Sequence, residues 1–238
     1  MQCLAGAKNH SVVMPDCEMK STVETIMSSS FGCAGERCVA TSVVVAVGEV
    51  GDRLVNELIK AGDATKIGPG DQPGCGMGPV ITQEARDRIA GYIELGQKEG
   101  AKLVRDGRKD TCDAGGYYLG TTIFDNVKPE MRIAREEIFG PVLSVIRARD
   151  LNHALEIVNG SEHGNASSIY TKSGATARHF AASTQTGMVG VNLGVPAPVA
   201  VFPFSGWKNS FFGDLHALGK DGVRFYTETK VVTSRWPE

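Results

Sequence analysis

The stretch Phe31-Gly32-Cys33-Ala34-Gly35-Glu36-Arg37-Cys38, with the run Thr41-Ser42-Val43-Val44-Val45-Ala46-Val47 that follows it, decides how this chain is interpreted. The β-branched run predicts a buried strand. The glycines allow a turn that brings the backbone close to a ligand. A cysteine on such a turn lies at the edge of a sheet, where Cys38 could act as a nucleophile beside the Arg37 guanidinium. The alternative is a buried, unreactive cysteine, which is common in proteins.

Composition limits the classes of partner. The chain has 238 residues, enough for one large or two smaller domains, and a formal net charge of −2. This charge balance gives no reason to expect nucleic acid or a membrane surface as a partner. We find no signal-peptide pattern and no apolar run long enough to span a bilayer, so we expect a soluble protein.

The six cysteines are too sparse for a disulfide-stapled fold, which favours a reducing compartment. Cys33 and Cys38 resemble half of a metal site, but no second pair of Cys or His residues stands at ligand spacing. We therefore expect no bound metal.

Apolar periodicity predicts an alternation of strands and helices, which indicates an α/β fold with a mainly parallel sheet flanked by helices. We expect strands at 11–14, 41–47, 102–105, 119–124, 142–147, 167–170 and 188–192. We expect helices capped by Asp16, Thr82, Asp150 and Ser173, the last reaching about Thr186, and another from Val50 that ends before Gly62.

Three segments are expected to be irregular or extended. Residues 67–79 are dense in glycine and proline but lack both the P-loop lysine and the dinucleotide fingerprint, so they predict a structural loop. Residues 135–141 place paired carboxylates before an aromatic and a Gly-Pro turn, which by itself favours a solvated turn over a ligand edge. Residues 193–213 are rich in proline, glycine and aromatics and could form a pocket wall.

The closing segment 224–235 alternates polar and apolar residues and predicts an extended strand. A strand at the end of a chain needs an edge to pair with, so it suggests a partner subunit.

Four motifs together resemble the aldehyde dehydrogenase superfamily, and they cover nearly the whole chain in the family's order. They are the segment Gly35-x-x-Cys38, the motif Glu136-Glu137-Ile138-Phe139-Gly140-Pro141-Val142, the motif Pro203-Phe204-Ser205-Gly206-Trp207-Lys208, and the closing Phe225-Tyr226-Thr227-Glu228-Thr229-Lys230. Gly6-Ala7-Lys8-Asn9-His10, Gly35-Glu36-Arg37-Cys38, Ser210-Phe211-Phe212-Gly213-Asp214 and Gly219-Lys220-Asp221-Gly222 resemble the coenzyme A-acylating, methylmalonate-semialdehyde branch.

The resemblance implies roles for five residues. Cys38 is the thiolate that attacks the aldehyde, and its backbone N–H is one donor to the resulting oxyanion. Arg37 matches the arginine that binds the substrate carboxylate, and Phe204 lines the substrate site. Glu137 matches the residue that binds the nicotinamide ribose of NAD, and Phe139 packs beside it.

One position departs from the family in an informative way. Most aldehyde dehydrogenases carry a glutamate four residues before the lysine equivalent to Lys8, as base for the deacylating water; here it is Leu4. Leucine cannot accept a proton, so the thioacyl enzyme would await a better nucleophile such as coenzyme A. Cys33, where many relatives have asparagine, has no functional explanation.

The resemblance therefore implies oxidation of methylmalonate or malonate semialdehyde to propionyl- or acetyl-CoA with NAD, as in valine catabolism, by a homo-oligomer such as a dimer or homotetramer. It begins mid-protein and covers the carboxyl-terminal half. We expect a catalytic domain over 1–212, a return segment and oligomerisation strand over 213–238, and no NAD-binding domain. The cytoplasm, or the mitochondrial matrix in a eukaryote, is the expected compartment. A truncated, inactive chain, an oligomerisation module and a hydrolytic enzyme remain alternatives.

Overall fold

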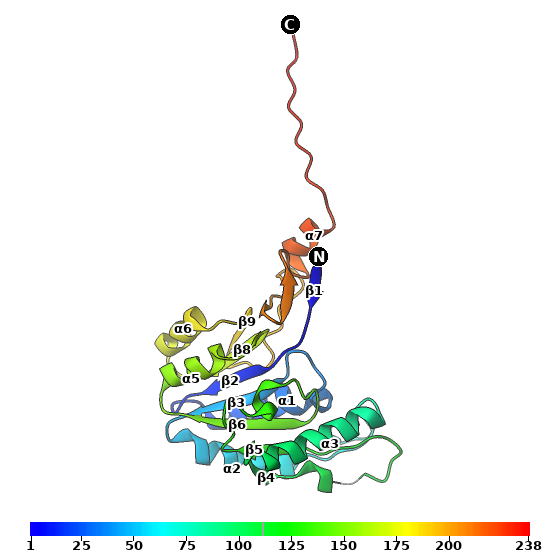
Figure 1. The fold of residues 1–238 in the computed structure, drawn as a ribbon, viewed down its shortest axis with the longest axis vertical. Helices are drawn as coiled ribbons and strands as arrows, with labels where there is room; N and C mark the ends of the chain where they lie inside the picture. The colour runs from blue at the N-terminus through cyan, green and yellow to red at the C-terminus, as the bar shows by residue number, and fades with distance from the viewer. Residues whose placement is uncertain (111) are drawn as a thin grey trace.

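The computed structural model describes residues 1–110 and 112–238, and its centre is a seven-stranded sheet (Figure 1). Neighbouring strands run parallel, except that β4 and β5 are antiparallel. In spatial order the strands are β4 (Lys102–Arg105), β5 (Thr122–Asp125), β6 (Val142–Ala148), β3 (Thr41–Val47), β2 (Asn9–Val13), β8 (Ala166–Tyr170) and β9 (Met188–Val191). This arrangement confirms the predicted α/β fold.

Helices cover both faces of this sheet. Figure 1 shows α5 and α6 on one face and α1 and α2 on the other. These helices are α1 (Met19–Phe31), α2 (Val50–Asp63), α5 (Leu151–Asn159) and α6 (Gly174–Ser183). The long helix α3 (Gln83–Lys98) packs on the short α4 (Arg132–Arg135) and on β4. Because both faces of a parallel sheet are covered, its central strands can be apolar throughout.

The core lies where β3 meets these helices. Val43, Val44 and Val45 of β3 are fully buried, and so are Leu54 and Leu58 of α2. The run that predicted a buried strand is therefore the centre of the sheet, between β6 and β2.

Three of the four predicted helix caps are confirmed. The side chains of Thr82, Asp150 and Ser173 each accept a hydrogen bond from the backbone N–H three residues later. The prediction for Asp16 is wrong, because α1 begins at Met19 and Glu18 caps it by accepting from the N–H groups of Lys20 and Ser21.

The Asp16 carboxylate is used for a different contact. It accepts hydrogen bonds from the Thr171 hydroxyl and from the Lys172 N–H, which follow β8. The contact therefore ties the end of β2 to the end of β8, a role that no local pattern near Asp16 indicates.

Two predicted helix ends shift for reasons of packing. Helix α2 continues through Gly62 to Asp63. A Cβ at Gly62 would lie 2.7 Å from Cδ of Arg105 and 2.9 Å from the Thr121 hydroxyl oxygen, so this glycine permits close packing and does not end the helix. Helix α6 ends at Ser183, before the predicted Thr186. The hydroxyls of Thr184 and Thr186 instead hydrogen-bond Ser167 on β8.

The loop 67–79 is irregular as predicted, with one isolated bridge between Ile67 and Met77. Two short 3₁₀ turns complete the backbone, η1 (Gly32–Gly35) and η2 (Gly107–Lys109). None of the helices in the described ranges has both the length and the apolarity to cross a lipid bilayer.

A narrow arm extends from one edge of the sheet domain (Figure 1). In this arm β1 (Gln2–Leu4) pairs with β11 (Phe211–Gly213), and the short helix α7 (Gly219–Phe225) follows. At its base β10 (Trp207–Lys208) pairs with β7 (His163–Gly164).

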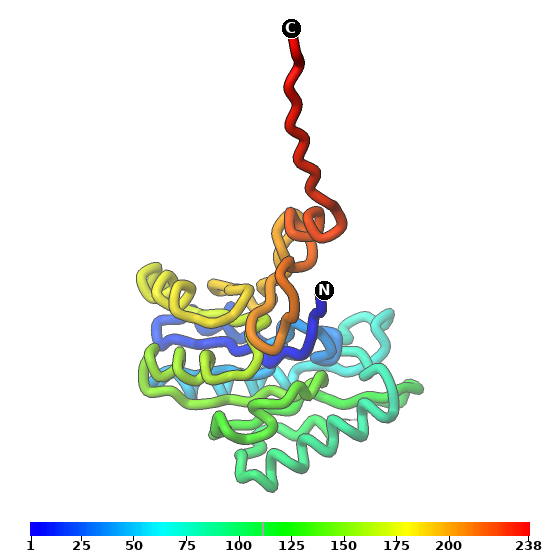
Figure 2. Tube along the Cα trace, turned by 45° about the horizontal axis from the view of Figure 1, so that its top comes forward, coloured from blue at the N-terminus to red at the C-terminus, as the bar shows by residue number. Residues whose placement is uncertain are grey.

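The prediction of a strand at 224–235 is wrong for this chain taken alone. Arg224 and Phe225 belong to α7, and among the described residues 226–238 form no strand and are exposed. Figure 2 shows this tail running away from the rest of the molecule, so no sheet edge of the same chain lies beside it.

Truncation of a side chain under β3 should test the core. We expect Leu54→Ala to lower the free energy of unfolding by about 2–5 kcal/mol, because the side chain is fully buried and its removal leaves a cavity. The neighbouring exposed variant Arg53→Ala should change it by less than about 0.5 kcal/mol. Urea unfolding of both variants measures the difference, and equal losses would contradict this assignment of the core.

Candidate active site

Cys38 lies on the loop that joins η1 to β3, and its thiol is free and exposed. The preceding turn is left-handed at Cys33 and Ala34, with φ of 53° at both, and at Gly35, with φ of 73°. This conformation is unfavourable for residues with a Cβ, so the turn is held by its surroundings. Exposure of the thiol argues against the alternative of a buried, unreactive cysteine.

The turn is held partly by a close backbone contact with the motif at 136–142. A Cβ on Gly35 would overlap the Gly140 carbonyl. Only glycine therefore allows this approach, which brings together two motifs that are about a hundred residues apart in the sequence. The contact places Cys38 and the carboxylate of Glu137 in one region.

Two buried asparagines hold the backbone of Cys38. Its carbonyl oxygen accepts hydrogen bonds from the Asn9 amide at 2.9 Å and from the Asn165 amide at 2.8 Å. Asn9 also donates to the Ala40 carbonyl and accepts from the Ala166 N–H. The N–H of Cys38 donates no hydrogen bond within the described chain, so it is available to an oxyanion.

Sequence reasoning missed both asparagines as site residues. Asn9 stands in the motif Gly6-Ala7-Lys8-Asn9-His10, but nothing local indicates that its amide reaches Cys38. Asn9 and Asn165 each lie two residues before a predicted strand, 11–14 and 167–170, and only the structure shows that both amides are buried and therefore need hydrogen-bond partners.

The Arg37 side chain turns back toward the end of α1. Its Nη2 donates to the carbonyl oxygens of Ser28 and Ser29 at 2.6 and 2.9 Å. Its Nε is buried and has no partner among the described residues. The guanidinium thus satisfies carbonyls at the helix C-terminus and retains N–H groups that the chain does not use.

Glu137 and Phe139 meet Arg37 in the wall of one small cavity of about 10 Å³. This space is enough for roughly one water molecule. The Phe139 backbone is left-handed, with φ of 52°, and its ring is 40% exposed. Glu137 is half-buried and Ile138 is buried, so the interpretation of 135–141 as a solvated turn is wrong.

The neighbouring carboxylate Glu136 is committed to structural contacts. It accepts from the Tyr92 hydroxyl and pairs with Arg132, and these hydrogen bonds, that of Arg132 first, lower the pKa of its carboxyl. Glu137 makes no such pair among the described residues, which leaves its carboxylate available to a ligand.

Lys8 is the buried cation of this region. Its Nζ donates to the Glu136 carbonyl at 2.7 Å. Burial lowers the pKa of Lys8 from 10.5 to about 7, and the carboxylates of Glu137 and Glu136 oppose this shift. Lys8 therefore anchors the backbone beside Glu137 whether or not it carries a charge.

A larger cavity of about 400 Å³ opens on the other side of Glu137. His163 also lines it, and Nδ1 of that imidazole is buried without a partner among the described residues. A Cβ on Gly6 would lie 3.0 Å from the His163 ring and 3.3 Å from the Glu137 carboxylate, so the absence of that side chain keeps this corner open. An acceptor carboxylate beside an unpartnered ring nitrogen fits a ligand that carries hydroxyl groups.

Phe204 comes near Cys38 in the chain's structure through its packing on Val39. Its half-buried ring packs on a small apolar cluster of Val39, Ala166 and Met188, and Val39 is the residue directly after Cys38. Leu4, by contrast, sits on β1 opposite Phe211 of β11 and is 55% exposed.

The family model described as the aldehyde dehydrogenase family matches residues 1–232. The chain belongs to the aldehyde dehydrogenase family. Two bacterial relatives named malonate-semialdehyde dehydrogenase are similar to it over 99% of this chain: one from Geobacillus kaustophilus at 56% identity and one from Geobacillus thermodenitrificans at 57%.

Solved structures of the family have the same fold. A methylmalonate-semialdehyde dehydrogenase from Sinorhizobium meliloti, complexed with NAD, superposes on all of this chain with a TM-score of 0.97 and 46% identity. One from Oceanimonas doudoroffii gives 0.96 and 47%. The chain spans 49% of each of these two structures and of both Geobacillus relatives, which is about half of their length.

The Lys8 environment predicts a pH-dependent stability. Between pH 7 and 10.5 the unfolded chain binds a proton at Lys8 that the folded chain releases, so the free energy of unfolding should rise with pH. The rise attributable to Lys8 is at most about 1.4 kcal/mol per pH unit. Urea unfolding at pH 7 and 9 should show a flatter profile for Lys8→Met. The exposed control Lys20→Met should follow the parent protein, and parallel profiles for all three would contradict the prediction.

The contacts of the Asn9 amide predict that one substitution changes both the stability of the fold and the reactivity of Cys38. Asn9→Asp keeps the shape of the side chain but directs a carboxylate at two carbonyl oxygens, so we expect a loss of at least about 2 kcal/mol. The rate of Cys38 alkylation by iodoacetamide, measured by peptide mass, should change as well. Asn209→Asp, at an exposed position, is the control, and an unchanged alkylation rate in Asn9→Asp would argue against this role.

Proposed function

We propose that this chain carries the catalytic part of an NAD-dependent malonate- or methylmalonate-semialdehyde dehydrogenase that transfers its acyl group to coenzyme A. The observation that carries the proposal is the free, exposed thiol of Cys38, whose carbonyl is held by two buried amides. The available carboxylate of Glu137 lines the same small cavity as Asn9 and Arg37. The names of the similar proteins support this substrate class.

Cys38 is the proposed nucleophile. Its thiolate forms a bond to the aldehyde carbon while the carbonyl electrons move to oxygen, which gives a thiohemiacetal. The backbone N–H of Cys38, which has no acceptor in the described chain, can donate to the oxyanion as its charge develops. The Asn9 and Asn165 amides hold the carbonyl of the next peptide, between Cys38 and Val39, and so restrain the loop that carries this N–H.

Glu137 and Phe139 are the proposed cofactor residues. NAD, when bound, supplies the hydride acceptor. The Glu137 carboxylate can accept hydrogen bonds from ribose hydroxyls, and the exposed Phe139 ring can pack beside the nicotinamide. The unpartnered His163 Nδ1 in the same cavity wall is consistent with a polar ligand there.

Arg37 and Phe204 are the proposed substrate residues. The N–H groups of Arg37 that the chain does not use suit a carboxylate, which a planar guanidinium can bind through two hydrogen bonds. Phe204 packs beside Val39 and can cover the apolar part of the semialdehyde.

Transfer to coenzyme A is proposed because the chain offers no base at Leu4. A leucine side chain cannot activate water, so the Cys38 thioester would persist until a thiolate attacks it. The substrate's own carboxylate would leave as CO₂, and the α-carbon that keeps the electron pair of the broken bond would take a proton from water. The coenzyme A sulfur would bond to the acyl carbon and Cys38 would leave as thiolate. The products are propionyl- or acetyl-CoA.

We also propose that 1–212 form the catalytic domain and that 213–238 serve assembly into a homo-oligomer, a dimer or tetramer. The exposed apolar side chains of Val231, Val232 and Trp236 on the tail support the second part. A second candidate function is an assembly module without activity of its own, which the exposed apolar side chains of the tail also fit.

Mass measurement should separate these proposals. We expect the chain, incubated with malonate semialdehyde and NAD, to gain an acyl mass on the Cys38 peptide, to release NADH, and to lose the adduct when coenzyme A is added. Cys38→Ser should abolish the adduct, whereas the matched control Cys33→Ser should retain it. Selective alkylation of Cys38 by iodoacetamide without NADH or adduct would support the inactive module and contradict activity of this chain.

A further inference from the structure

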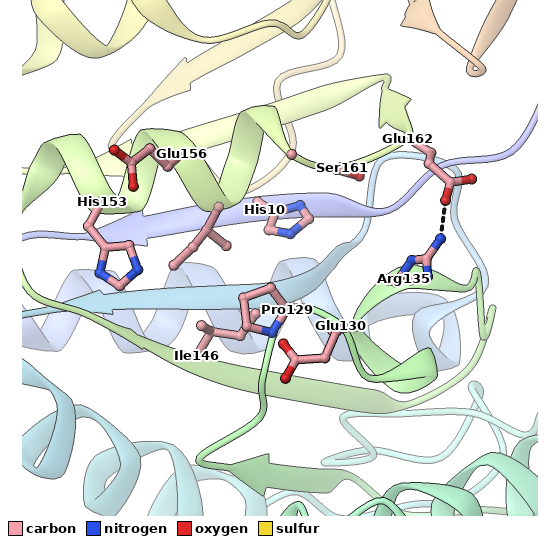
Figure 3. Close-up of a pocket in the computed structure, with 12 residues that line it drawn as sticks. His10, Pro129, Glu130, Arg135, Ile146, His153, Glu156, Ser161 and Glu162 are labelled. Atoms are coloured by element: carbon pink, nitrogen blue, oxygen red, sulfur yellow. Dashed lines mark hydrogen bonds and ion pairs between the residues drawn. The ribbon is translucent and has the colours of Figure 1, made fainter.

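A cavity of about 460 Å³ lies between α5 and the segment that leads into α4 (Figure 3), and Cys38 is not among the residues that line it. Its volume falls within the range of small-molecule sites. Ala134, Ile146 and Ile157 give it an apolar floor. The Arg135–Glu162 ion pair lies in the wall of both this cavity and the one beside Glu137, so the two spaces are neighbours but have different linings.

His10 contributes a hydrogen-bond acceptor to this cavity. The residue is 5% exposed and lines the space, and Figure 3 shows its imidazole between α5 and Pro129. Its Nδ1 lies 2.8 Å from the Lys8 carbonyl oxygen, which can only accept, so Nδ1 carries the proton. Nε2 then carries a lone pair and has no partner among the described residues.

His10 stays neutral near physiological pH. Burial lowers the pKa of its imidazole to about 4, and the charges of Lys8, Lys208 and His163 act in the same direction. The hydrogen bond to the Lys8 carbonyl opposes this shift without cancelling it. The wall of the cavity therefore has an uncharged hydrogen-bond acceptor, Nε2 of the buried His10.

The rim of the cavity is acidic. Glu130, Glu156 and Glu162 line it against the single guanidinium of Arg135, and Arg135 is already paired with Glu162. His153 also lines it, and its Nδ1 faces the Arg149 N–H at 3.2 Å. Glu130 and Glu156 make no ion pair among the described residues, so acidic groups outnumber basic ones in the cavity wall. The Lys208 ammonium, which does not line the cavity, donates to the Asn159 and Ser161 carbonyls.

We propose that this cavity is a second ligand site, which binds a primary ammonium group carried on a short apolar chain. The ammonium can donate a hydrogen bond to the His10 Nε2 lone pair, and its positive charge is attracted by the acidic rim. The apolar chain packs on Ile146 and Ile157. A carboxylate ligand would meet repulsion from the same rim and would find no donor at His10. The site is independent of the dehydrogenase proposal, because it uses neither Cys38 nor Glu137.

Calorimetric titration of the whole chain tests this site with three probes of similar size: n-butylammonium, n-butanol and butyrate, at constant ionic strength. We expect saturable binding of n-butylammonium, with n-butanol weaker and butyrate weakest. Glu130→Gln should weaken n-butylammonium by about two- to fivefold, as for a partly exposed ion pair. Glu94→Gln, at an exposed position on α3, should leave it unchanged. Equal affinities in these two variants, or n-butanol binding as tightly as n-butylammonium, would overturn the proposal.

An NMR measurement of the His10 side chain in the unmodified chain gives a second test. The His10 Nε2 resonance should have the chemical shift of an unprotonated nitrogen and should move when n-butylammonium is added. His10→Phe, which keeps a ring of similar size, identifies the signal by its loss. A protonated Nε2, or a resonance that does not respond at saturating n-butylammonium, would show that His10 is not the acceptor.

Discussion

The amide of Asn9 is the interaction on which the site depends most. It is buried in β2 and hydrogen-bonds the strand on either side, through Ala40 before β3 and through Ala166 at the start of β8. The same amide reaches the carbonyl of Cys38. A buried amide left unpaired would cost about 1–3 kcal/mol, so the strands and the loop can satisfy it only in one arrangement. The position of the proposed nucleophile is thus a consequence of how the sheet is assembled.

A second constraint acts from the other side of the loop. Gly35 and Gly140 approach so closely that neither backbone can move toward the other, and the left-handed turn at Cys33 and Ala34 is held in place between this contact and β3. Strained backbone that is fixed by its surroundings is common at functional sites. Here the strained residues are confined to the loop, because Asn9 and Asn165 anchor its other end at the Cys38 carbonyl.

Lys8 connects the two cavities described above. Its side chain holds the carbonyl of Glu136, next to the proposed cofactor carboxylate, while its own carbonyl fixes the tautomer of His10. One buried residue at the start of β2 therefore orients groups that face two separate spaces. Its depressed pKa follows from the same burial, which the carboxylates of Glu137 and Glu136 offset only in part.

The sequence by itself determined the α/β class, the central strand 41–47, three helix caps and the two motifs that form the loop around Cys38. Each of these depends on neighbouring residues, through periodicity, a cap or a glycine turn. Tertiary structure alone decided that Asn9 and Asn165 hold Cys38, that Asp16 bonds Thr171 instead of capping α1, and that the tail has no edge to pair with in its own chain. The Asn165–Cys38 and Asp16–Thr171 contacts each join positions more than 120 residues apart. Asn9 and Cys38 are 29 residues apart and meet across adjacent strands. Such partners are set by which strands become neighbours in the sheet, and a local pattern does not contain that order.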